Sequence, residues 1–313
     1  MRKKLIILAV VAIMALIVVL FIFQDPERMV LSATVREQAP GDFILLPQGY
    51  VHYELAGPEA GQPVVLVHGF SAPSYTWDPT FQALAVAGYR VLRYDLFGRG
   101  YSDRPEVTYD RELFVQQLHD LLTALAIRPP VDLIGHSMGG AIAADFTAEY
   151  PEMVRKVVLI SPALTPYTSP VNVFLSKILK TPVLGELFMR TVFVPFLPKA
   201  QLRDLYRPER FPDWVKRYRP QMQIRGFRRA LLSTARHYIH EDKRYVYQRL
   251  AGKDKPVLLI WGTEDQTNPP AHNQVLRDIL APQFLLVEEA GHLPHVERPE
   301  VVNPRLVDFL QQG

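Results

Sequence analysis

The sequence of 313 residues contains no cysteine. This absence excludes disulfides, thiolate metal sites and a cysteine nucleophile, and it makes the chain indifferent to the redox state of its compartment. A strong charge is lacking too, because a formal net charge of +3 is too small to indicate a nucleic-acid partner. Hydrophobic residues make up 48% of the chain, which is enough for a sizeable buried core.

The small net charge hides an uneven distribution. Residues 171–253 hold 18 Lys and Arg against 6 Asp and Glu, whereas the rest of the chain holds 17 against 26. One interpretation is that the apolar residues of 171–197 line a pocket for an apolar chain or dip into a membrane, while the basic remainder faces anionic lipid. The other is that this segment packs on the rest of the chain and leaves a solvated basic surface.

A run of 19 apolar residues extends from Leu5 to Phe23. As a helix it would be about 28 Å long, close to the thickness of a bilayer core. Basic residues at positions 2–4 precede it, which predicts a cytoplasmic N-terminus and a catalytic domain outside the cytoplasm, periplasmic in a bacterium. Residues 1–24 are therefore expected to anchor a single-pass membrane protein. A cleaved signal peptide is the alternative, although its apolar part usually has only about 7–15 residues.

Short apolar runs that alternate with amphipathic helices predict an α/β fold. We expect a mostly parallel eight-stranded sheet with helices on both faces, and a core made of residues 25–161 and 256–313. Residues 162–255 contain no convincing strand and predict an inserted helical cap. The expected strands are Phe43–Leu46, Tyr50–Leu55, Pro63–Val67, Gly88–Tyr94, Val131–Ile134, Val154–Ser161, Pro256–Trp261 and Phe284–Val287. The expected core helices are Tyr109–Ile127, Met138–Tyr150 and Pro299–Leu310.

The motif Gly-His-Ser-Met-Gly at residues 135–139 lies between a predicted strand and a predicted helix. A lone Gly-x-Ser-x-Gly is weak evidence, but this context is the one that a nucleophile elbow requires. The glycines allow a tight turn, which leaves the hydroxyl of Ser137 exposed near a helix N-terminus. Ser137 is therefore the predicted nucleophile, and a simple helix-capping serine is the alternative.

A serine nucleophile needs a base, and the base needs an orienting acid. Both follow later strands in the chain order that this architecture uses. Asp265 is favoured over Glu264 because the shorter carboxylate lies further along its loop. His292 is favoured over His295 because it directly follows a glycine at the loop apex, and we expect His295 to be a structural hydrogen-bonding residue.

The oxyanion hole is expected to use two backbone N–H groups. One belongs to Met138, directly after the nucleophile, and the other to Phe70, which follows a strand and Gly69. A plain turn is the alternative for the second. His68 and His136 are expected to pack and form hydrogen bonds rather than to act in catalysis.

The sequence resembles the α/β-hydrolase superfamily in the segments HGF, DLFGRGYSDRP, GHSMGG, WGTEDQ and GHLPHVERPE. The resemblance runs from about Phe43 to the C-terminus, interrupted by the cap, and implies that Ser137, Asp265 and His292 form a triad. Haloalkane dehalogenases and epoxide hydrolases share this outline but carry Asp at the nucleophile position, so Ser137 argues against both families. One esterase branch carries HGGG in its oxyanion loop, so HGF argues against that branch. The apolar N-terminus looks like that of the membrane-bound monoacylglycerol lipase branch.

The resemblance implies a carboxylesterase or monoacylglycerol-type lipase that forms an acyl-enzyme without metal or organic cofactor. A small-molecule or lipid ester is the expected partner, with the membrane as a second partner and nucleic acid excluded; the oligomeric state is open. Carbon–carbon bond hydrolysis, perhydrolysis and ligand sensing on a hydrolase scaffold are the alternatives. Ester hydrolysis is expected to fall below about pH 6.5 as His292 protonates.

Overall fold

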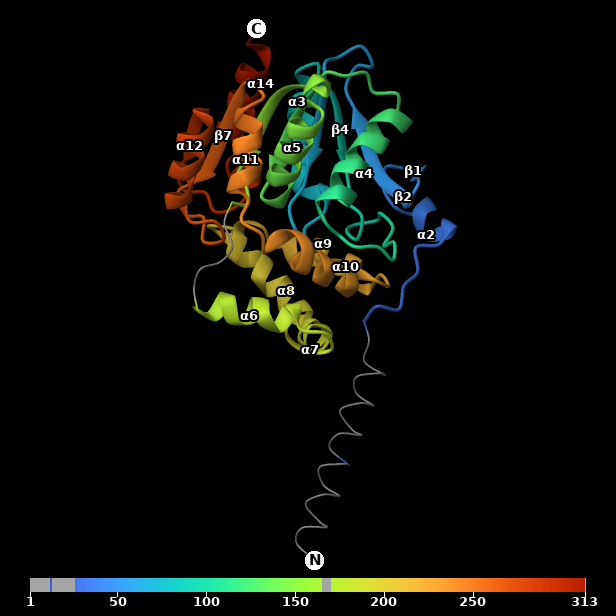
Figure 1. Cartoon of the computed structure of the whole chain (residues 1–313). Helices are drawn as coiled ribbons and strands as arrows, with labels where there is room; N and C mark the ends of the chain where they lie inside the picture. The colour runs from blue at the N-terminus through green and yellow to red at the C-terminus, as the bar shows by residue number, and fades with distance from the viewer. Residues whose placement is uncertain (1–11, 13–25, 165–169, 313) are drawn as a thin grey trace, which may run out of the picture.

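The computed structural model describes residue 12 and residues 26–164 and 170–312. Its centre is an eight-stranded sheet in the order β1-β2-β4-β3-β5-β6-β7-β8 (Figure 1). The pairs β1–β2 and β2–β4 are antiparallel and all the others are parallel. The strands are β1 (Asp42–Leu46), β2 (Gly49–Ala56), β3 (Pro63–Val67), β4 (Arg90–Tyr94), β5 (Val131–His136), β6 (Val154–Ile160), β7 (Val257–Gly262) and β8 (Gln283–Val287). The predicted α/β fold with a mostly parallel sheet is confirmed.

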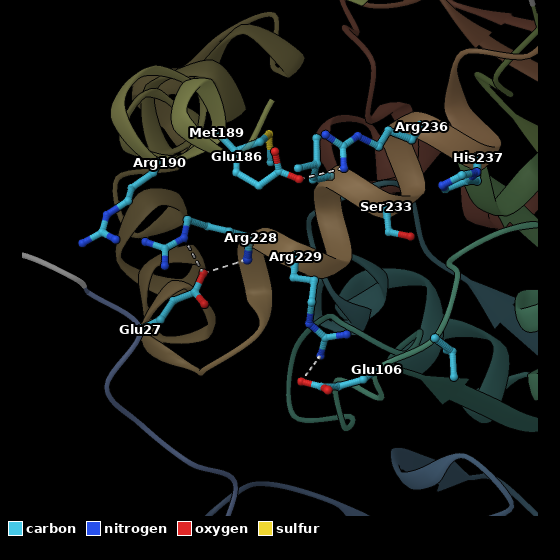
Figure 2. Close-up of a pocket in the computed structure, with 12 residues that line it drawn as sticks. Glu27, Glu106, Glu186, Met189, Arg190, Arg228, Arg229, Ser233, Arg236 and His237 are labelled. Atoms are coloured by element: carbon cyan, nitrogen blue, oxygen red, sulfur yellow. Dashed lines mark hydrogen bonds and ion pairs between the residues drawn. The ribbon is translucent and has the colours of Figure 1, made fainter. Parts of the chain in front are cut away.

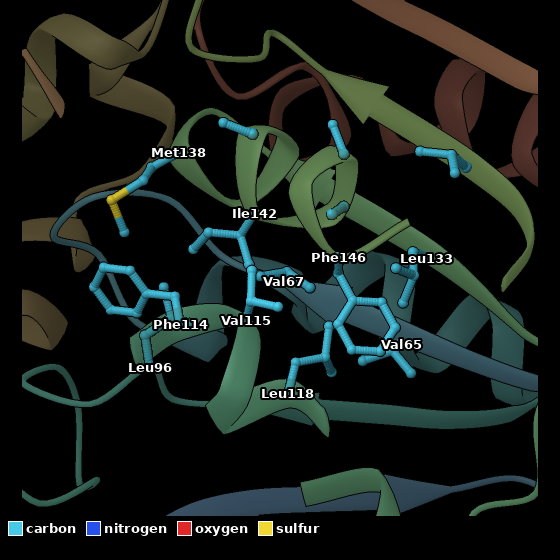
Figure 3. Close-up of a cluster of buried hydrophobic side chains, with 14 of the residues drawn as sticks. Val65, Val67, Leu96, Phe114, Val115, Leu118, Leu133, Met138, Ile142 and Phe146 are labelled. Atoms are coloured by element: carbon cyan, nitrogen blue, oxygen red, sulfur yellow. The ribbon is translucent and has the colours of Figure 1, made fainter. Parts of the chain in front are cut away.

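Helices cover both faces of this sheet because successive residues of a buried strand point to opposite sides. On one face, Val65 and Leu133 pack with Phe114 of α4 and Phe146 of α5 (Figure 3). On the other face, the neighbouring strand residues pack with α3 and α14. The helices outside the long β6–β7 connection are α2 (Ala33–Glu37), α3 (Asp78–Val86), α4 (Arg111–Ala124), α5 (Met138–Glu149), α12 (Asn273–Leu280), α13 (Pro294–Glu297) and α14 (Pro299–Gln311).

The described part of the long connection between β6 and β7 consists of helices joined by turns, with no strand, and we refer to it as the insertion. Its first helices, α6 to α10, gather beyond one end of the sheet (Figure 1). They share an apolar cluster of their own that includes Leu179, Leu197 and Phe227. Its last helix, α11, packs instead against α5 and α12 of the core. The helices of the insertion are α6 (Pro170–Lys180), α7 (Leu184–Phe188), α8 (Val194–Ala200), α9 (Trp214–Tyr218), α10 (Phe227–Thr234) and α11 (Arg244–Ala251).

Part of the surplus of positive charge in residues 171–253 is paired with carboxylates elsewhere in the chain. Figure 2 shows two of the pairs, in which Arg228 meets Glu27 and Arg229 meets Glu106. The other pairs of this kind are Arg207–Glu289, Arg217–Asp78 and Arg249–Asp145. The carboxylates of Glu27 and Asp145 are buried, whereas the other pairs are more exposed and each contributes little free energy. This pairing favours the second interpretation of the charge asymmetry, a segment that packs on the rest of the chain.

The N-terminal part of the described chain holds the insertion in the same way. The carboxylate of Glu27 accepts hydrogen bonds from the backbone N–H groups of Gly226 (2.8 Å) and Arg228 (2.7 Å) at the start of α10. A negative charge is favourable there because the first N–H groups of a helix have no partner within the helix. Met29 adds a β-bridge to Ile224. Residues 27–29 thus tie the insertion to the strand β1 that follows.

The prediction of a membrane location requires correction. In residue 12 and residues 26–164 and 170–312, no helix is long and apolar enough to cross a membrane. A crossing helix needs about 20 consecutive apolar residues, so this finding contradicts the predicted single-pass protein with its catalytic domain outside the cytoplasm. The predicted anchor at residues 1–24 lies outside the described residues, except for Ala12.

Candidate active site

Ser137 occupies a sharp turn between β5 and α5. Its backbone has φ 53° and ψ −118°, in a region that residues with a side chain rarely adopt. The turn is possible because the flanking glycines allow a close approach: a Cβ on Gly135 would lie 2.3 Å from the carbonyl oxygen of Gly139. The described structure therefore places Ser137 at a strained strand-to-helix turn, the backbone geometry expected of a nucleophile elbow.

Replacing Gly139 with alanine is expected to destabilise this turn. The added Cβ would lie 2.1 Å from the backbone oxygen of Val67 in β3, and a strand backbone cannot give way as a side chain can. Overpacking of this kind typically costs about 1–3 kcal/mol of unfolding free energy. Gly252→Ala is the matched control, because its Cβ would come no closer than 3.6 Å to Arg249. Urea denaturation with equal midpoints for the two variants would contradict this account.

His292 and Asp265 are brought together from the loops after β8 and β7. The Nδ1 atom of His292 lies 2.8 Å from Oδ2 of Asp265, and both side chains are almost completely buried. The other oxygen of Asp265 accepts the backbone N–H groups of Thr267 (2.9 Å) and Asn268 (2.7 Å). Because these bonds fix the carboxylate, it can hold the imidazole with Nδ1 protonated and Nε2 available as a base.

The pKa of His292 lies above its ordinary value of 6.5. Burial lowers it, but the charge and hydrogen bond of Asp265 outweigh that effect, and Asp204 and Glu297 add to the rise. Only the neutral imidazole can accept a proton, so kcat/KM is expected to fall as the pH drops through a value above 6.5, higher than the sequence alone suggests. A pH profile of kcat/KM checks this; full activity retained below pH 6 would contradict it.

Glu264 and His295, the alternatives for the acid and the base, lie in different surroundings from Asp265 and His292. Glu264 is exposed, whereas Asp265 is buried against His292. His295 is fully buried, but neither of its ring nitrogens has a hydrogen-bond partner among the described residues, and its ring lies 4.3 Å from that of Trp77. Burial lowers the pKa of His295 to about 3, so it stays neutral. The expectation that His295 is a hydrogen-bonding residue is therefore wrong, because the site supplies an aromatic neighbour in place of a polar partner.

The other two histidines do form the hydrogen bonds expected of them. His68 accepts the N–H of Leu96 through Nε2 (2.9 Å), and burial lowers its pKa to about 4. The Nε2 atom of His136 lies 2.9 Å from the carbonyl oxygen of His292, and the two rings are 4.7 Å apart. His136 thus holds the main chain of the histidine loop beside the nucleophile.

The predicted oxyanion groups lie on either side of Ser137. Met138 begins α5, and Phe70 lies in the loop after β3, where a Cβ on Gly69 would be only 3.4 Å from Cβ of Ser137. Within the part of the chain that the structure describes, neither the Phe70 nor the Met138 N–H has an acceptor. An oxyanion hole requires donors without a protein acceptor, so the prediction for these two N–H groups stays open to test.

A cavity of about 490 Å³ joins these groups. Ser137, His292 and Phe70 line it, together with apolar residues of the insertion such as Phe188 and Leu197. No hydrogen bond joins the side chains of Ser137 and His292, both of which are described. Such catalytic hydrogen bonds are often long in a free enzyme and tighten when substrate binds.

The structure adds two residues that the sequence analysis missed. Arg99 lies in the glycine-rich loop at residues 95–105, is fully buried, and donates from Nε to the carbonyl of Phe70 (2.8 Å), which fixes the oxyanion loop. An arginine inside an otherwise turn-forming motif was the available signal. Asp204 comes from the insertion and lines the cavity beside His292, with no periodicity or motif to mark it. Among the described residues, no group of three or more His, Asp or Glu side chains could hold a metal ion.

Comparison with known proteins places the chain in a family. A family model described as the alpha/beta hydrolase family matches residues 64–305. The chain belongs to the alpha/beta hydrolase family. It is 28% identical to Lipase 1 of Psychrobacter immobilis over 253 residues, which cover 78% of this chain and 75% of that protein. It is also similar to two solved structures.

The first is an enol-lactonase from Burkholderia xenovorans LB400, with a TM-score of 0.72, 24% identity and coverage of 87% of this chain and 100% of that one. The second is a membrane phospholipase A, with a TM-score of 0.70, 25% identity and coverage of 98% of both chains. These similarities support a hydrolytic enzyme of this superfamily, as its motifs predict. They do not confirm the predicted membrane-anchored branch. Family membership alone does not show which bond is cleaved.

Proposed function

We propose that this alpha/beta hydrolase is a serine esterase that cleaves carboxylic esters through an acyl-enzyme. The observation that carries the proposal is the 2.8 Å contact between Nδ1 of His292 and Oδ2 of Asp265, with His292 lining the same cavity as Ser137. Asp265 orients the imidazole of His292, and His292 accepts the proton of the Ser137 hydroxyl, as in a serine–histidine–aspartate triad.

The chemistry then follows from the groups in the cavity. The Ser137 oxygen attacks the ester carbonyl, and the backbone N–H groups of Phe70 and Met138 bind the oxygen that becomes negative. His292 passes its proton to the departing alcohol, which leaves an acyl group on Ser137. Water repeats the attack with His292 again as the base and releases the acid.

An apolar acyl group suits the walls of the cavity. We assign residues 162–255 as a cap over a core of residues 25–161 and 256–313, and the cap supplies Leu179, Phe188 and Leu197 to the lining. Acyl-glycerol or other lipid-like esters fit this lining, and the similarity to Lipase 1 supports that class. Carbon–carbon bond hydrolysis is the second candidate, because a meta-cleavage product hydrolase has the same fold, with a TM-score of 0.69 and 24% identity.

A substrate panel separates these candidates. We expect the protein to hydrolyse p-nitrophenyl esters with acyl chains of two to twelve carbons and to prefer a chain long enough to contact the apolar wall, because buried CH₂ groups each contribute about 0.8 kcal/mol. Vinylogous diketones test the second candidate in the same buffer. Turnover of diketones without turnover of any ester would contradict the proposed function.

A further inference from the structure

Asp204 places a second carboxylate next to the catalytic histidine. It ends the short helix η4 (Gln201–Asp204) of the insertion, and its backbone oxygen accepts the N–H of His292 at 2.7 Å. Its side-chain oxygen Oδ1 accepts the hydroxyl of Thr267 at 2.6 Å. Since the N–H of Thr267 binds Asp265, Asp204 contacts both loops that carry the acid and the base.

The other oxygen of Asp204 has no hydrogen-bond partner among the described residues. Oδ2 accepts no hydrogen bond from a described residue, yet it is not sealed off from accessible space, and Asp204 lines the cavity together with Ser137 and His292. Burial raises the pKa of Asp204, against the opposing effects of His292 and Thr267. A carboxylate in this setting gains most from a bound hydrogen-bond donor, because a partly desolvated acceptor left unpaired costs free energy.

The lining of the cavity differs between its two sides, and this difference indicates which part of the substrate carries the hydrogen-bond donor for Asp204. The apolar cluster that contains Leu179 and Leu197 packs against Phe70, on the side of the oxyanion loop. Asp204 and Thr267 lie on the side of His292, the group that gives its proton to the departing alcohol. The acyl chain therefore belongs to the first wall and the alcohol to the second.

We infer that Asp204 recognises the alcohol part of the substrate by accepting a hydrogen bond from a hydroxyl group beside the ester oxygen. The substrate class that follows is the monoester of a polyol, of which a glycerol monoester is the simplest lipid-like example. A cationic alcohol fits less well because Arg203 and Lys243 also line the cavity. This inference rests on the proposed esterase function and adds to it the chemistry of the leaving group.

The test compares two esters of the same fatty acid, the glycerol monoester and the ethyl ester. The measured quantity is the ratio of kcat/KM for the two substrates in the wild type, in Asp204→Asn and in Asp204→Ala. A hydrogen bond to a charged group predicts that each substitution lowers this ratio about tenfold to hundredfold. Asp204→Asn keeps the backbone oxygen for His292 and an acceptor for Thr267, so it preserves the fold if Asp204→Ala does not. Glu209→Gln, an exposed carboxylate of the same segment, is the control and should keep the wild-type ratio.

The outcomes separate the two proposals. A ratio that stays at the wild-type value in Asp204→Asn, with both esters slowed equally, would show a purely structural role and overturn the inference while leaving the esterase function intact. A wild type that prefers the ethyl ester would overturn it as well. If the wild type hydrolyses neither ester, the proposed function fails and this inference fails with it.

Discussion

Substitution of Ser137 by alanine is expected to lower kcat for a p-nitrophenyl ester roughly 10⁴- to 10⁶-fold. The alanine removes the hydroxyl oxygen that is proposed to attack the carbonyl, while the proposed oxyanion donors and the cavity walls remain to support a small residual rate. The substitution removes only one side-chain oxygen atom, so the fold and the unfolding midpoint should stay near those of the wild type. Initial rates at saturating substrate measure the effect.

The control for Ser137 is Ser176→Ala. Ser176 lies on helix α6 of the insertion and does not line the cavity. Its substitution should leave kcat within about twofold of the wild type, since surface changes away from special features have small effects. Near-normal turnover by Ser137→Ala, with a folded protein, would remove the serine mechanism altogether.

Substitution of Asp265 by asparagine is expected to lower kcat about 10⁴-fold. The carboxylate oxygen that lies 2.8 Å from Nδ1 of His292 would be replaced by an amide that cannot stabilise the imidazolium and can favour the wrong tautomer. The raised pKa of His292 should also fall, because Asp265 supplies the main effects that raise it. The measurement is a pH profile of kcat/KM, in which the acid limb moves to lower pH along with the loss of rate.

Glu264→Gln is the matched control for Asp265, because the two carboxylates are neighbours in the chain and only one is buried. The control should retain the wild-type profile. The reverse result, with Glu264→Gln inactive and Asp265→Asn active, would reassign the acid of the triad.

The central fold and the expected nucleophile could be predicted from the sequence because both depend on local patterns. Buried strands appear as short apolar runs, and the elbow at Ser137 appears as glycines on either side of one serine. Asp265 and His292 could be predicted together because parallel strands end at the same edge of a sheet. Their predicted roles rest on this geometry and stay predictions until the variants are measured.

The features that the sequence did not reveal depend on contacts between distant segments. Asp204 lies in a helical insertion, and nothing in its neighbourhood in the chain indicates that its backbone meets His292. The same holds for Arg99, whose partner is the carbonyl of Phe70. His295 was misjudged because composition cannot tell whether a buried ring nitrogen faces a polar group or the ring of Trp77.

The partners of the basic residues in 171–253 also depend on contacts between distant segments. Counting residues shows a basic segment, but only the fold shows that Arg217 and Arg228 meet Asp78 and Glu27. The predicted membrane location depended on the composition of one apolar run and its flanking charges, and the described chain supplies no crossing helix.

The most direct test of the catalytic account is covalent labelling of the protein with a fluorophosphonate, which reacts with serines activated by a neighbouring base. After digestion, mass spectrometry of the wild type should locate one adduct on the peptide that contains Ser137, and this adduct should be lost in His292→Gln. Labelling of Ser137 that persists at the wild-type rate in His292→Gln, or an adduct on another serine, would contradict the account.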